Sequence, residues 1–457
     1  MTPRTITQSL HDLQSGALTA TALLDEVEAA ADRWDSSLGV YLYRSGQAAW
    51  AEAEQVDARR ERGEALGPLA GIPLGIKDVI ATYGAPTTAQ SLIARDPQVD
   101  APTVARLRAA GAVITGKTST MEYALGFNDP DKPFPMPRNP WDPLRWTGGS
   151  SSGTGSGIAA GFFLGGLGTD TAGSVRMPAA WCGVTGHKPT YGVVPRTGVF
   201  PLGWTYDHVG PLARTAEDCA LLLSVIAGPD GQDPAATGHG FAYSPEPVRP
   251  LRGLRIALAV DPLEVSTAEV CRLTREAAEV FAAAEAVVTE IRLPHYAEGV
   301  DVTMLGLAAE ALTYHRTDLR RRWEEYGRPT RSALITGALL SAADYVQVQR
   351  VRRHLVRAVA DLFDDIDLVL SPTAARPAPL VDGLDFDEVV AMLQTAYWNA
   401  TGNPALSAPM GLADGMPVGL QIVGRPHADQ LVLDAGRHFQ DLTDHHLRAP
   451  DLTEDER

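Results

Sequence analysis

The chain has 457 residues, of which 45% are hydrophobic and 21% are charged. This balance is typical of a folded globular protein and excludes disorder as the main state. The 39 Lys and Arg residues against 56 Asp and Glu residues give a net charge of −17. A protein that binds the phosphate backbone needs a positive field, so we expect no nucleic-acid partner.

The cysteines and the N-terminal residues indicate the cellular setting. Cys182, Cys219 and Cys271 lie far apart with no CxxC pairing, so neither a disulfide framework nor a thiolate metal site is expected. The first residues interleave apolar with polar side chains, unlike a signal peptide. The most apolar stretch, 158–168, is shorter than the ~20 residues of a membrane-spanning helix. We expect a cytoplasmic protein with no metal and no membrane contact.

Helix and strand signals alternate along the chain. Helical spacing of apolar residues, with Thr or Ser near the starts, predicts helices over 19–34 and 45–63. A β-rich run between Gly and Pro residues predicts a strand over 72–80. Later signals predict helices over 103–111, 216–228, 267–286, 387–399 and 428–441, and strands over 112–115, 165–169, 254–260, 367–373 and 419–424. This alternation indicates an α/β fold, with one large mixed β-sheet covered by helices on both faces.

Residues 229–252 are rich in Pro and Gly. Such a composition is typical either of a linker between domains or of a long surface connection within one domain. We favour the surface connection.

Two glycine-rich patterns point to nucleotide binding, but their contexts disfavour it. Residues 111–118, GAVITGKT, match the phosphate-loop pattern GxxxxGK[ST]. A phosphate loop follows a strand and opens a helix, whereas these inner residues are themselves strand-like and follow a predicted helix. Residues 155–160, GSGIAA, match the dinucleotide pattern GxGxxA, but no strand is predicted before them.

Residues 149–153, GSSSG, match the GxSxG nucleophile elbow, in which Ser151 would be the nucleophile. The elbow needs a strand directly before it. The preceding residues, RNPWDPLRWTG, contain two prolines and are predicted to form a loop, so the pattern does not support an elbow.

Two segments of small residues stand out, TGGSSSGTGSG at 147–157 and GTDTAGSVRMP at 168–178. The first alone would be typical of a flexible linker. The second, however, follows an apolar run and places a charged residue on either side of one serine. Small residues let backbone N–H groups approach a substrate carbonyl, so these segments are suited to an oxyanion loop beside a nucleophilic hydroxyl.

These segments resemble the amidase signature family of Ser-Ser-Lys amide hydrolases. The resemblance rests on GIPLGIKD at 71–78, GGSSSGTGSGIAAG at 148–161, GTDTAGSVRMPAAWCGVTGHKPTYG at 168–192, DHVGPLART at 207–215, and NPALSAPMG and MPVGLQIVGRP near the C-terminus. It implies the amidase signature fold, with one amidase domain over 1–457. Its expected parts are an N-terminal helical segment (about 1–65), a signature core (about 66–228), a variable helical region (about 229–365) and a return to the sheet (about 366–445).

The resemblance also implies the site residues. Lys77 matches the general base, Ser150 the bridging serine after a cis peptide bond, and Ser174 the acyl-forming nucleophile. The matching oxyanion hole consists of the backbone N–H groups of Thr171, Ala172, Gly173 and Ser174. The matching supporting residues are Ser151, Asp170 and Arg176. No metal and no organic cofactor is implied.

Ala172 stands where the family more often has glycine, so either this position is held at negative φ or the loop is reshaped. Lys77 lies in an apolar run, and burial there would favour its neutral, basic form. His187 and His208 compete for the role of base in a serine hydrolase. We interpret both histidines as structural.

The segments 125–137 and 199–206 are loop-like and rich in aromatic residues. We expect an apolar substrate pocket lined by Phe127, Phe200, Trp204 and Tyr206, although these side chains could also belong to the core. The expected partner is a small-molecule amide, apolar or aryl, with carbamates and esters as side substrates. The alternative is an amidotransferase A subunit that releases ammonia from glutamine and works with a partner protein. The oligomeric state, monomer or homodimer, stays open.

Overall fold

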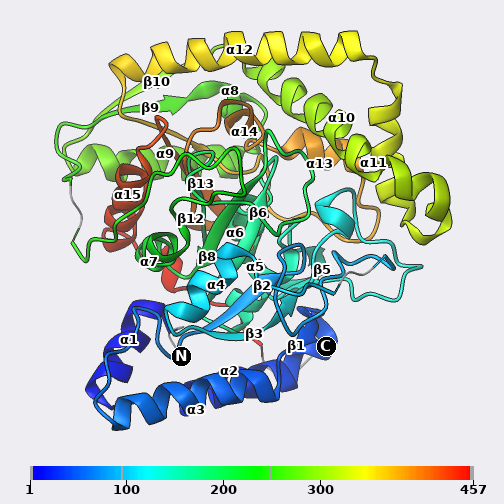
Figure 1. Ribbon diagram of the computed structural model, residues 1–457. Coiled ribbons are helices and arrows are strands. Elements are labelled where there is room, and N and C mark those ends of the chain that lie inside the picture. The colour runs from blue at the N-terminus through cyan, green and yellow to red at the C-terminus, as the bar shows by residue number, and fades with distance from the viewer. Residues whose placement is uncertain (1–3, 94–95, 247–248, 453–457) are drawn as a thin grey trace.

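Strands from across the chain form one large sheet at the centre of the molecule (Figure 1). The computed structural model describes residues 4–93, 96–246 and 249–452. The sheet has 11 strands in the order β1-β3-β2-β6-β8-β7-β12-β13-β11-β9-β10. They are β1 (Tyr41–Arg44), β2 (Pro73–Lys77), β3 (Val113–Thr118), β6 (Gly165–Asp170), β7 (Thr185–Lys188), β8 (His208–Ala213), β9 (Arg255–Ala259), β10 (Val287–Ile291), β11 (Leu368–Pro372), β12 (Ala405–Ala413) and β13 (Met416–Gly424).

The strand directions make this sheet mixed. β2 runs parallel to both β3 and β6, and β9 runs parallel to both β10 and β11. The strands between them pair antiparallel, from β6 through β8, β7, β12 and β13 to β11. The prediction of one large mixed sheet is therefore confirmed, and the strands predicted near 72–80, 112–115, 165–169, 254–260, 367–373 and 419–424 all belong to it.

Helices pack on both faces of the sheet. Successive residues of a strand point to opposite faces, and two neighbouring residues of β7 meet two different helices. A Cβ on Gly186 would lie 2.8 Å from Ala179 Cβ of α6. Its neighbour Thr185 accepts from Gln440 Nε2 of α15 at 2.9 Å. The helices are α1 (Ile6–Ser15), α2 (Ala20–Leu38), α3 (Gln47–Glu61), α4 (Pro102–Ala109), α5 (Ser152–Ala160), α6 (Arg176–Cys182), α7 (Ala216–Ile226), α8 (Val260–Glu264), α9 (Ala268–Ala283), α10 (Tyr296–Arg322), α11 (Arg328–Leu339), α12 (Ala342–Asp365), α13 (Phe386–Met392), α14 (Tyr397–Thr401) and α15 (Asp429–Asp441).

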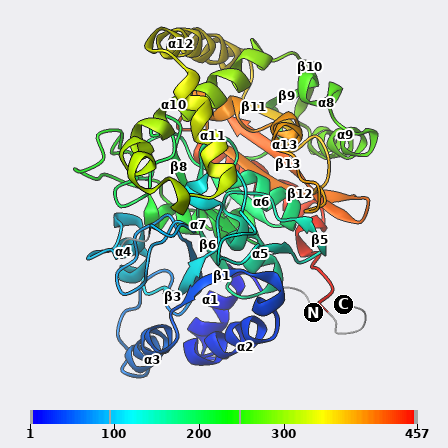
Figure 2. The same ribbon diagram turned by 90° about the vertical axis from the view of Figure 1, so that its right-hand side faces the viewer.

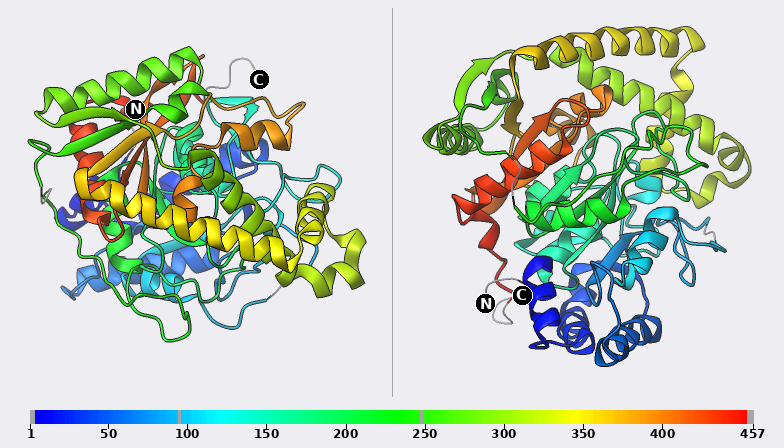
Figure 3. Two further views of the ribbon diagram at one scale, coloured as in Figure 1. Left: turned by 90° about the horizontal axis from the view of Figure 1, so that it is seen from above. Right: turned by 60° about the vertical axis from the view of Figure 1, so that its left-hand side comes forward.

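Two groups of long helices lie at opposite ends of the molecule, α1–α3 at one end and α10–α12 at the other (Figures 1 and 2). α12 lies across the outer surface of α10 (Figure 3). Side-chain caps set the starts of these helices: Thr19 accepts from Ala22 N at 3.1 Å, and Ser341 and Asp344 form a capping box. No helix in the described residues is both long and apolar enough to cross a membrane.

The Pro- and Gly-rich segment 229–252 lies against the same body as the sheet. The described part of this segment, 229–246 and 249–252, contains no helix or strand. Asp233 pairs with Arg196 at 3.1 Å, and Tyr243 donates to Glu217 at 2.8 Å. These contacts fit a surface connection rather than a linker between separate bodies.

The structure corrects two expectations about local elements. The helix predicted over 387–399 is two short helices, α13 and α14, because the chain between them turns to place Thr395 O 3.0 Å from Arg176 Nη1. The residues predicted as a loop before Gly149 include a short strand, β5 (Asp142–Trp146), which pairs with β4 (Arg138–Asn139) outside the main sheet.

The phosphate-loop match at 111–118 lies largely in β3, as its strand-like residues indicated. Its lysine, Lys117, is fully buried and pairs with Asp78 at 2.9 Å. Its glycine Gly116 lies against β1, where an added Cβ would come 2.2 Å from Tyr43 O. The pattern therefore serves the contact between β1 and β3.

We predict that Gly116→Ala destabilises the protein, because the new methyl group forces β1 and β3 apart. The expected loss is about 1–3 kcal/mol, as for other overpacked positions, measured as a lower midpoint of thermal unfolding. Gly231→Ala is the matched control, since a Cβ there meets nothing within 4 Å. Equal midpoints for the two variants would contradict the proposed role of Gly116.

Candidate active site

Lys77 and Ser150 meet inside the protein beside the carboxyl ends of β2 and β6. Lys77 Nζ lies 2.7 Å from Ser150 Oγ and 2.7 Å from Thr169 Oγ1. All three side chains are buried. β2 and β6 are parallel neighbours, so residues at their carboxyl ends come together at one edge. The contact with Thr169 was not expected from the sequence, although this residue lies within the small-residue segment.

The buried position changes the acid–base properties of Lys77. Loss of solvent lowers the pKa of its ammonium group to about 7, although the negative charges of Asp170 and Asp207 act in the opposite direction. A large fraction of Lys77 is therefore neutral at neutral pH, and only the neutral amine can accept a proton.

The backbone of Ser150 has two notable features. The Gly149–Ser150 peptide bond is cis, as the resemblance implied. Ser150 O accepts from Thr120 Oγ1 at 2.7 Å. The hydrogen bond from Thr120 holds Ser150 close to the start of α5.

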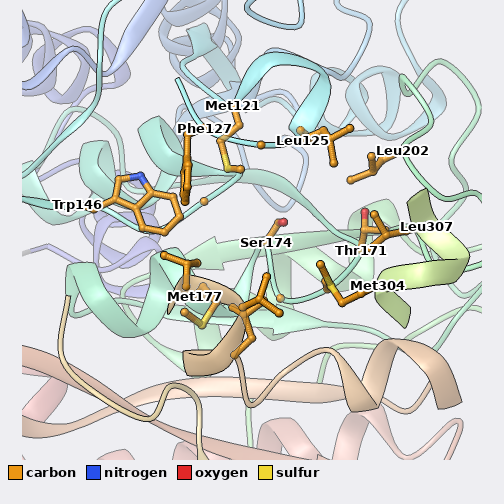
Figure 4. Close-up of a pocket in the computed structure, with 18 residues that line it drawn as sticks. Met121, Leu125, Phe127, Trp146, Thr171, Ser174, Met177, Leu202, Met304 and Leu307 are labelled. Atoms are coloured by element: carbon orange, nitrogen blue, oxygen red, sulfur yellow. The ribbon is translucent and has the colours of Figure 1, made fainter. Parts of the chain in front are cut away.

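Ser174 lies half-buried on the wall of a cavity (Figure 4). Its carbonyl oxygen accepts from Ser151 N at 3.2 Å, which joins the second small-residue segment to the first. No hydrogen bond of Ser174 Oγ is recorded within the described residues, so the Ser150–Ser174 contact is not closed in this structure.

Ser151, the serine of the elbow pattern, faces the sheet instead of the cavity. Its Oγ lies 3.3 Å from both the N and the O of Thr169. Gly168 permits this approach, since a Cβ there would lie 2.5 Å from Ser151 Oγ. Ser151 is fully buried and supports the contact of α5 with β6.

The loop 171–174 presents backbone N–H groups beside Ser174. Ala172 keeps a negative φ, and Gly173 takes the unusual value of +133°. This resolves the alternatives for Ala172, because the conformation that favours glycine falls one residue later. The N–H groups of Thr171, Ala172 and Ser174 have no recorded hydrogen bond within the described part of the chain.

Gly173 departs from the expected oxyanion hole. Its N–H donates to Asp170 Oδ1 at 2.8 Å, so this donor is already engaged. The carboxylate also accepts from Val175 N at 3.2 Å. The Asp170 carboxylate therefore holds the loop in shape through hydrogen bonds to the backbone of the loop. The N–H groups of Thr171, Ala172 and Ser174 are the donors that stay available.

Asp170 and Arg176 form a buried pair that braces this loop. Arg176 Nη2 donates to Asp170 Oδ1 at 2.8 Å, and Nε donates to Oδ2 at 3.0 Å. Burial alone would raise the pKa of the Asp170 carboxyl, but the Arg176 guanidinium holds it well below its usual range. Both side chains are fully buried. The supporting role expected for these two residues stays a prediction.

Residues from the C-terminal third, which sequence analysis missed, complete the brace. Arg176 donates to Asn399 Oδ1 at 2.6 Å and to Gln421 Oε1 at 2.7 Å. Thr395 Oγ1 donates to Ala172 O at 2.6 Å. Their signal in the sequence is slight, since only Gln421 falls within a quoted motif.

Asp207 is a further residue that sequence analysis missed. It accepts from Thr171 Oγ1 at 2.6 Å and from the backbone N–H groups of Leu202 and Gly203 at 3.0 and 3.1 Å. It therefore ties the segment 202–207 to the start of the loop at 171. Its position beside His208 in the DHVGPLART motif was the available signal.

His187 and His208 are buried, and their hydrogen bonds go to residues other than Lys77 and Ser150. His187 Nε2 lies 3.1 Å from Asp429 Oδ1. His208 Nδ1 donates to Asp170 O at 3.1 Å, which leaves its Nε2 as an acceptor for Lys188 Nζ at 3.3 Å. Burial and the charge of Lys188 lower the pKa of His208 well below its usual value. Neither histidine touches a serine of the site.

The cavity at Ser174 has a volume of about 80 Å³ and a mainly apolar wall (Figure 4). Phe127 lies on this wall, as expected. No charged side chain among the described residues lines it. The lining side chains other than those of the loop 171–174 are Met121, Ala124, Leu125, Phe127, Trp146, Met177, Leu202, Met304, Leu307, Val389, Val390 and Leu393.

Phe200, Trp204 and Tyr206 do not line the cavity, which corrects the expected pocket. Phe200 packs against Tyr123 at a ring distance of 5.5 Å, Trp204 is 43% exposed, and Tyr206 is fully buried. The segment itself does reach the cavity, but through Leu202. The hydrogen bonds of Asp207 to this segment decide which side chain faces inward, and residue type alone does not reveal them.

Comparison with known proteins assigns the family. The family described as Amidase matches residues 22–433. The chain belongs to the amidase signature family. Its relatives and structural neighbours include amide hydrolases, and the chain is an amidase of this family.

Three relatives illustrate the range of this amidase family. The chain is 38% identical to a putative amidase, AmiD, of Mycobacterium tuberculosis, over 97% of this chain and 95% of AmiD. It is 36% identical to the A subunit of the glutamyl-tRNA(Gln) amidotransferase of Chloroflexus aggregans, over 98% of both chains. The crystal structure of a bacterial aryl acylamidase superposes with a TM-score of 0.88 at 25% identity, over 97% of both chains.

The described part of this amidase offers no cluster of metal ligands. Within residues 4–93, 96–246 and 249–452, no group of three or more His, Cys, Asp or Glu side chains is arranged to hold a metal ion. The buried carboxylates nearest the loop 171–174, Asp170 and Asp207, are instead engaged with Arg176 and Thr171.

Arg176→Met should destabilise this amidase strongly, because it leaves the Asp170 carboxylate buried without its cation. Breaking such a pair costs about 3–5 kcal/mol, which urea unfolding measures directly. Arg292→Met is the control, since Arg292 pairs with Glu264 on the surface, and it should leave the unfolding midpoint nearly unchanged. A small effect of Arg176→Met would mean that the brace is dispensable.

Proposed function

We propose that this amidase hydrolyses carboxamides through an acyl ester on Ser174, with Ser150 and Lys77 moving the protons. The observation that carries the proposal is the 2.7 Å contact between Lys77 Nζ and Ser150 Oγ in a fully buried setting. Burial lowers the pKa of Lys77 to about 7, which suits a general base at neutral pH.

In the first step, neutral Lys77 takes the proton of Ser150, and Ser150 takes the proton of Ser174. The Oγ of Ser174 then attacks the amide carbon. The negative charge on the carbonyl oxygen is stabilised by the N–H groups of Thr171, Ala172 and Ser174. One such donor contributes ~3–4 kcal/mol in serine proteases.

In the second step, the C–N bond breaks and Ser150 delivers a proton to the leaving nitrogen. The acyl group remains on Ser174 as an ester. Water then attacks this ester, again with proton transfer through Ser150 to Lys77, and releases the acid. Ser174 regains its proton, so the cycle closes without a cofactor.

The wall of the cavity supports an apolar or aryl amide as the substrate. A glutamine substrate carries an ammonium and a carboxylate group, and burying them without partners is costly. No charged side chain of the described residues lines the cavity, whereas Phe127 and Trp146 offer aromatic surface. Carbamates and esters present the same carbonyl to Ser174, and we propose them as side substrates.

The second candidate is a glutamine-hydrolysing amidotransferase A subunit that works with a partner protein. The 36% identity to such a subunit over 98% of both chains favours it. The purified chain separates the two proposals: the amidase turns over aryl amides alone, whereas the amidotransferase component is nearly inert on them without its partner.

Ser174→Ala should reduce amide turnover by roughly 10⁴-fold or more, because it removes the attacking oxygen. It should also abolish labelling by a serine-directed fluorophosphonate, read by intact-protein mass. Ser151→Ala is the matched control and should still be labelled, since Ser151 Oγ faces Thr169. Persistent labelling of Ser174→Ala at Ser151 would favour the elbow instead.

The pH profile tests the role of Lys77. Because the base must be neutral, kcat/KM for amides should rise about tenfold per pH unit below the lowered pKa of about 7 and level off above it. Lys77→Met should remove this rising limb. It should also slow amides more than esters, because an amine leaves poorly without a proton from Ser150.

Histidine variants serve as controls for this profile. His187→Gln and His208→Asn each keep a nitrogen or oxygen near the contact atom of the native ring, so folding should be retained. Both should keep the rising limb. The lysine assignment is wrong if Lys77→Met keeps a normal profile while a histidine variant loses it.

A further inference from the structure

The cavity at Ser174 joins two separate hydrophobic clusters of the core. Met121, Trp146 and Met177 belong to one cluster, against which Phe127 packs. Leu125, Leu202 and Leu307 belong to the other, against which Met304 packs. Figure 4 shows Phe127 and Trp146 on one side of Ser174 and Leu202 and Leu307 on the other. The cavity therefore has an aromatic side (Met121, Phe127, Trp146) and an aliphatic side (Leu202, Met304, Leu307).

Ser150 lies toward the aromatic side. It follows Gly149, which lines the cavity, and a Cβ on Gly149 would come 2.4 Å from Met121 Sδ and 3.0 Å from Trp146 Cζ2. The Ser150 carbonyl oxygen accepts a hydrogen bond from the hydroxyl of Thr120, the residue before Met121.

The aliphatic side lies toward the other end of the loop 171–174. A Cβ on Gly203 would come 3.0 Å from Leu307 Cβ and 3.4 Å from Thr171 Cγ2. Leu202 is held beside Thr171 because both donate to Asp207. The aromatic side of the cavity thus lies toward Ser150, the proposed proton-transfer end of the site. The aliphatic side lies toward Thr171, at the start of the proposed oxyanion loop.

We propose that the leaving amine occupies the aromatic side and the acyl group the aliphatic side, so that this amidase prefers N-aryl amides of short aliphatic acids. The proposal rests on the proposed function. When the C–N bond breaks and the Ser174 Oγ–C bond forms, the proton of Ser174 passes through Ser150 to the nitrogen. The amine must therefore lie next to Ser150, and its ring meets Phe127 and Trp146.

The space beyond each side fits this orientation. A hollow of about 450 Å³ shares Phe127 and Trp146 with the cavity, and Asn128, Arg138 and Asp382 also line it. It offers room for a larger or polar-substituted amine. Leu202 and Leu307 are only 5% and 4% exposed, so they close the opposite side to long acyl chains.

The aromatic rings of Phe127 and Trp146 are arranged for a third ring. They form an edge-to-face pair with centroids 5.3 Å apart and an interplanar angle of 82°. Aromatic rings favour this geometry because the positive edge of one meets the negative face of the other. An aryl amine can continue the same arrangement, whereas an alkyl amine cannot.

A matrix of four substrates tests the orientation: acetyl and hexanoyl amides of aniline and of methylamine. Phe127→Ala should lower kcat/KM for anilides relative to methylamides by roughly tenfold and leave the hexanoyl-to-acetyl ratio unchanged. Leu307→Ala should raise the hexanoyl-to-acetyl ratio by roughly tenfold and leave the aniline-to-methylamine ratio unchanged. Phe127→Leu and Leu202→Ala replace these variants if either fails to fold.

Hydroxylamine gives an independent readout, since it competes with water for the acyl group on Ser174. Acetanilide and phenyl acetate form the same acetyl ester on Ser174. The two substrates should therefore give the same ratio of hydroxamate to acid. Phe127→Ala should change this ratio equally for both substrates, because water and hydroxylamine reach the ester from the side of Ser150 that the amine has left. Leu307→Ala should leave the ratio nearly unchanged, because Leu307 lies on the acyl side.

Opposite effects of the two variants, with Phe127→Ala acting on acyl length and Leu307→Ala on the amine, would overturn the orientation. Equal effects of both variants on both ratios would also overturn it. Failure of the proposed function looks different: the unmodified chain would then turn over none of the four amides and would not be labelled at Ser174 by a fluorophosphonate.

Discussion

The amino group of Lys77 lies inside the protein, out of contact with solvent, and the surrounding structure depends on keeping it there. An ammonium group in this position is costly, so burial lowers the pKa of Lys77 to about 7. Asp170 and Asp207 limit this effect by their negative charge. The balance leaves an amine that can both accept and return a proton near neutral pH.

The same two carboxylates also shape the loop 171–174, which lines the cavity. Asp170 accepts from the N–H of Gly173, and Asp207 accepts from the hydroxyl of Thr171. Arg176 keeps Asp170 ionised, and through Thr395, Asn399 and Gln421 it connects this loop to the C-terminal third of the chain. The loop 171–174 is therefore held by one connected set of buried polar contacts that reaches the C-terminal third of the chain.

The apolar wall is assembled from distant parts of the chain. Met121 and Phe127 precede the small-residue segments, Met304 and Leu307 come from α10, and Val389 from α13. Met121 and Val389 belong to one hydrophobic cluster and Leu307 to another, so the cavity lies where two parts of the core meet. The shape of the cavity at Ser174 therefore depends on helices that lie far from Ser174 in the sequence.

The sequence by itself determined the α/β fold, most strands of the sheet and the family, because these depend on local periodicity and on contiguous motifs. It also singled out Lys77, Ser150 and Ser174, whose 2.7 Å lysine–serine contact lies between residues 73 positions apart. Only the tertiary structure decided that Leu202 rather than Phe200, Trp204 or Tyr206 faces the cavity, and that Gly173 N–H is engaged by Asp170. These outcomes depend on side-chain direction and on hydrogen bonds between segments, which arise only when the sheet brings those segments together.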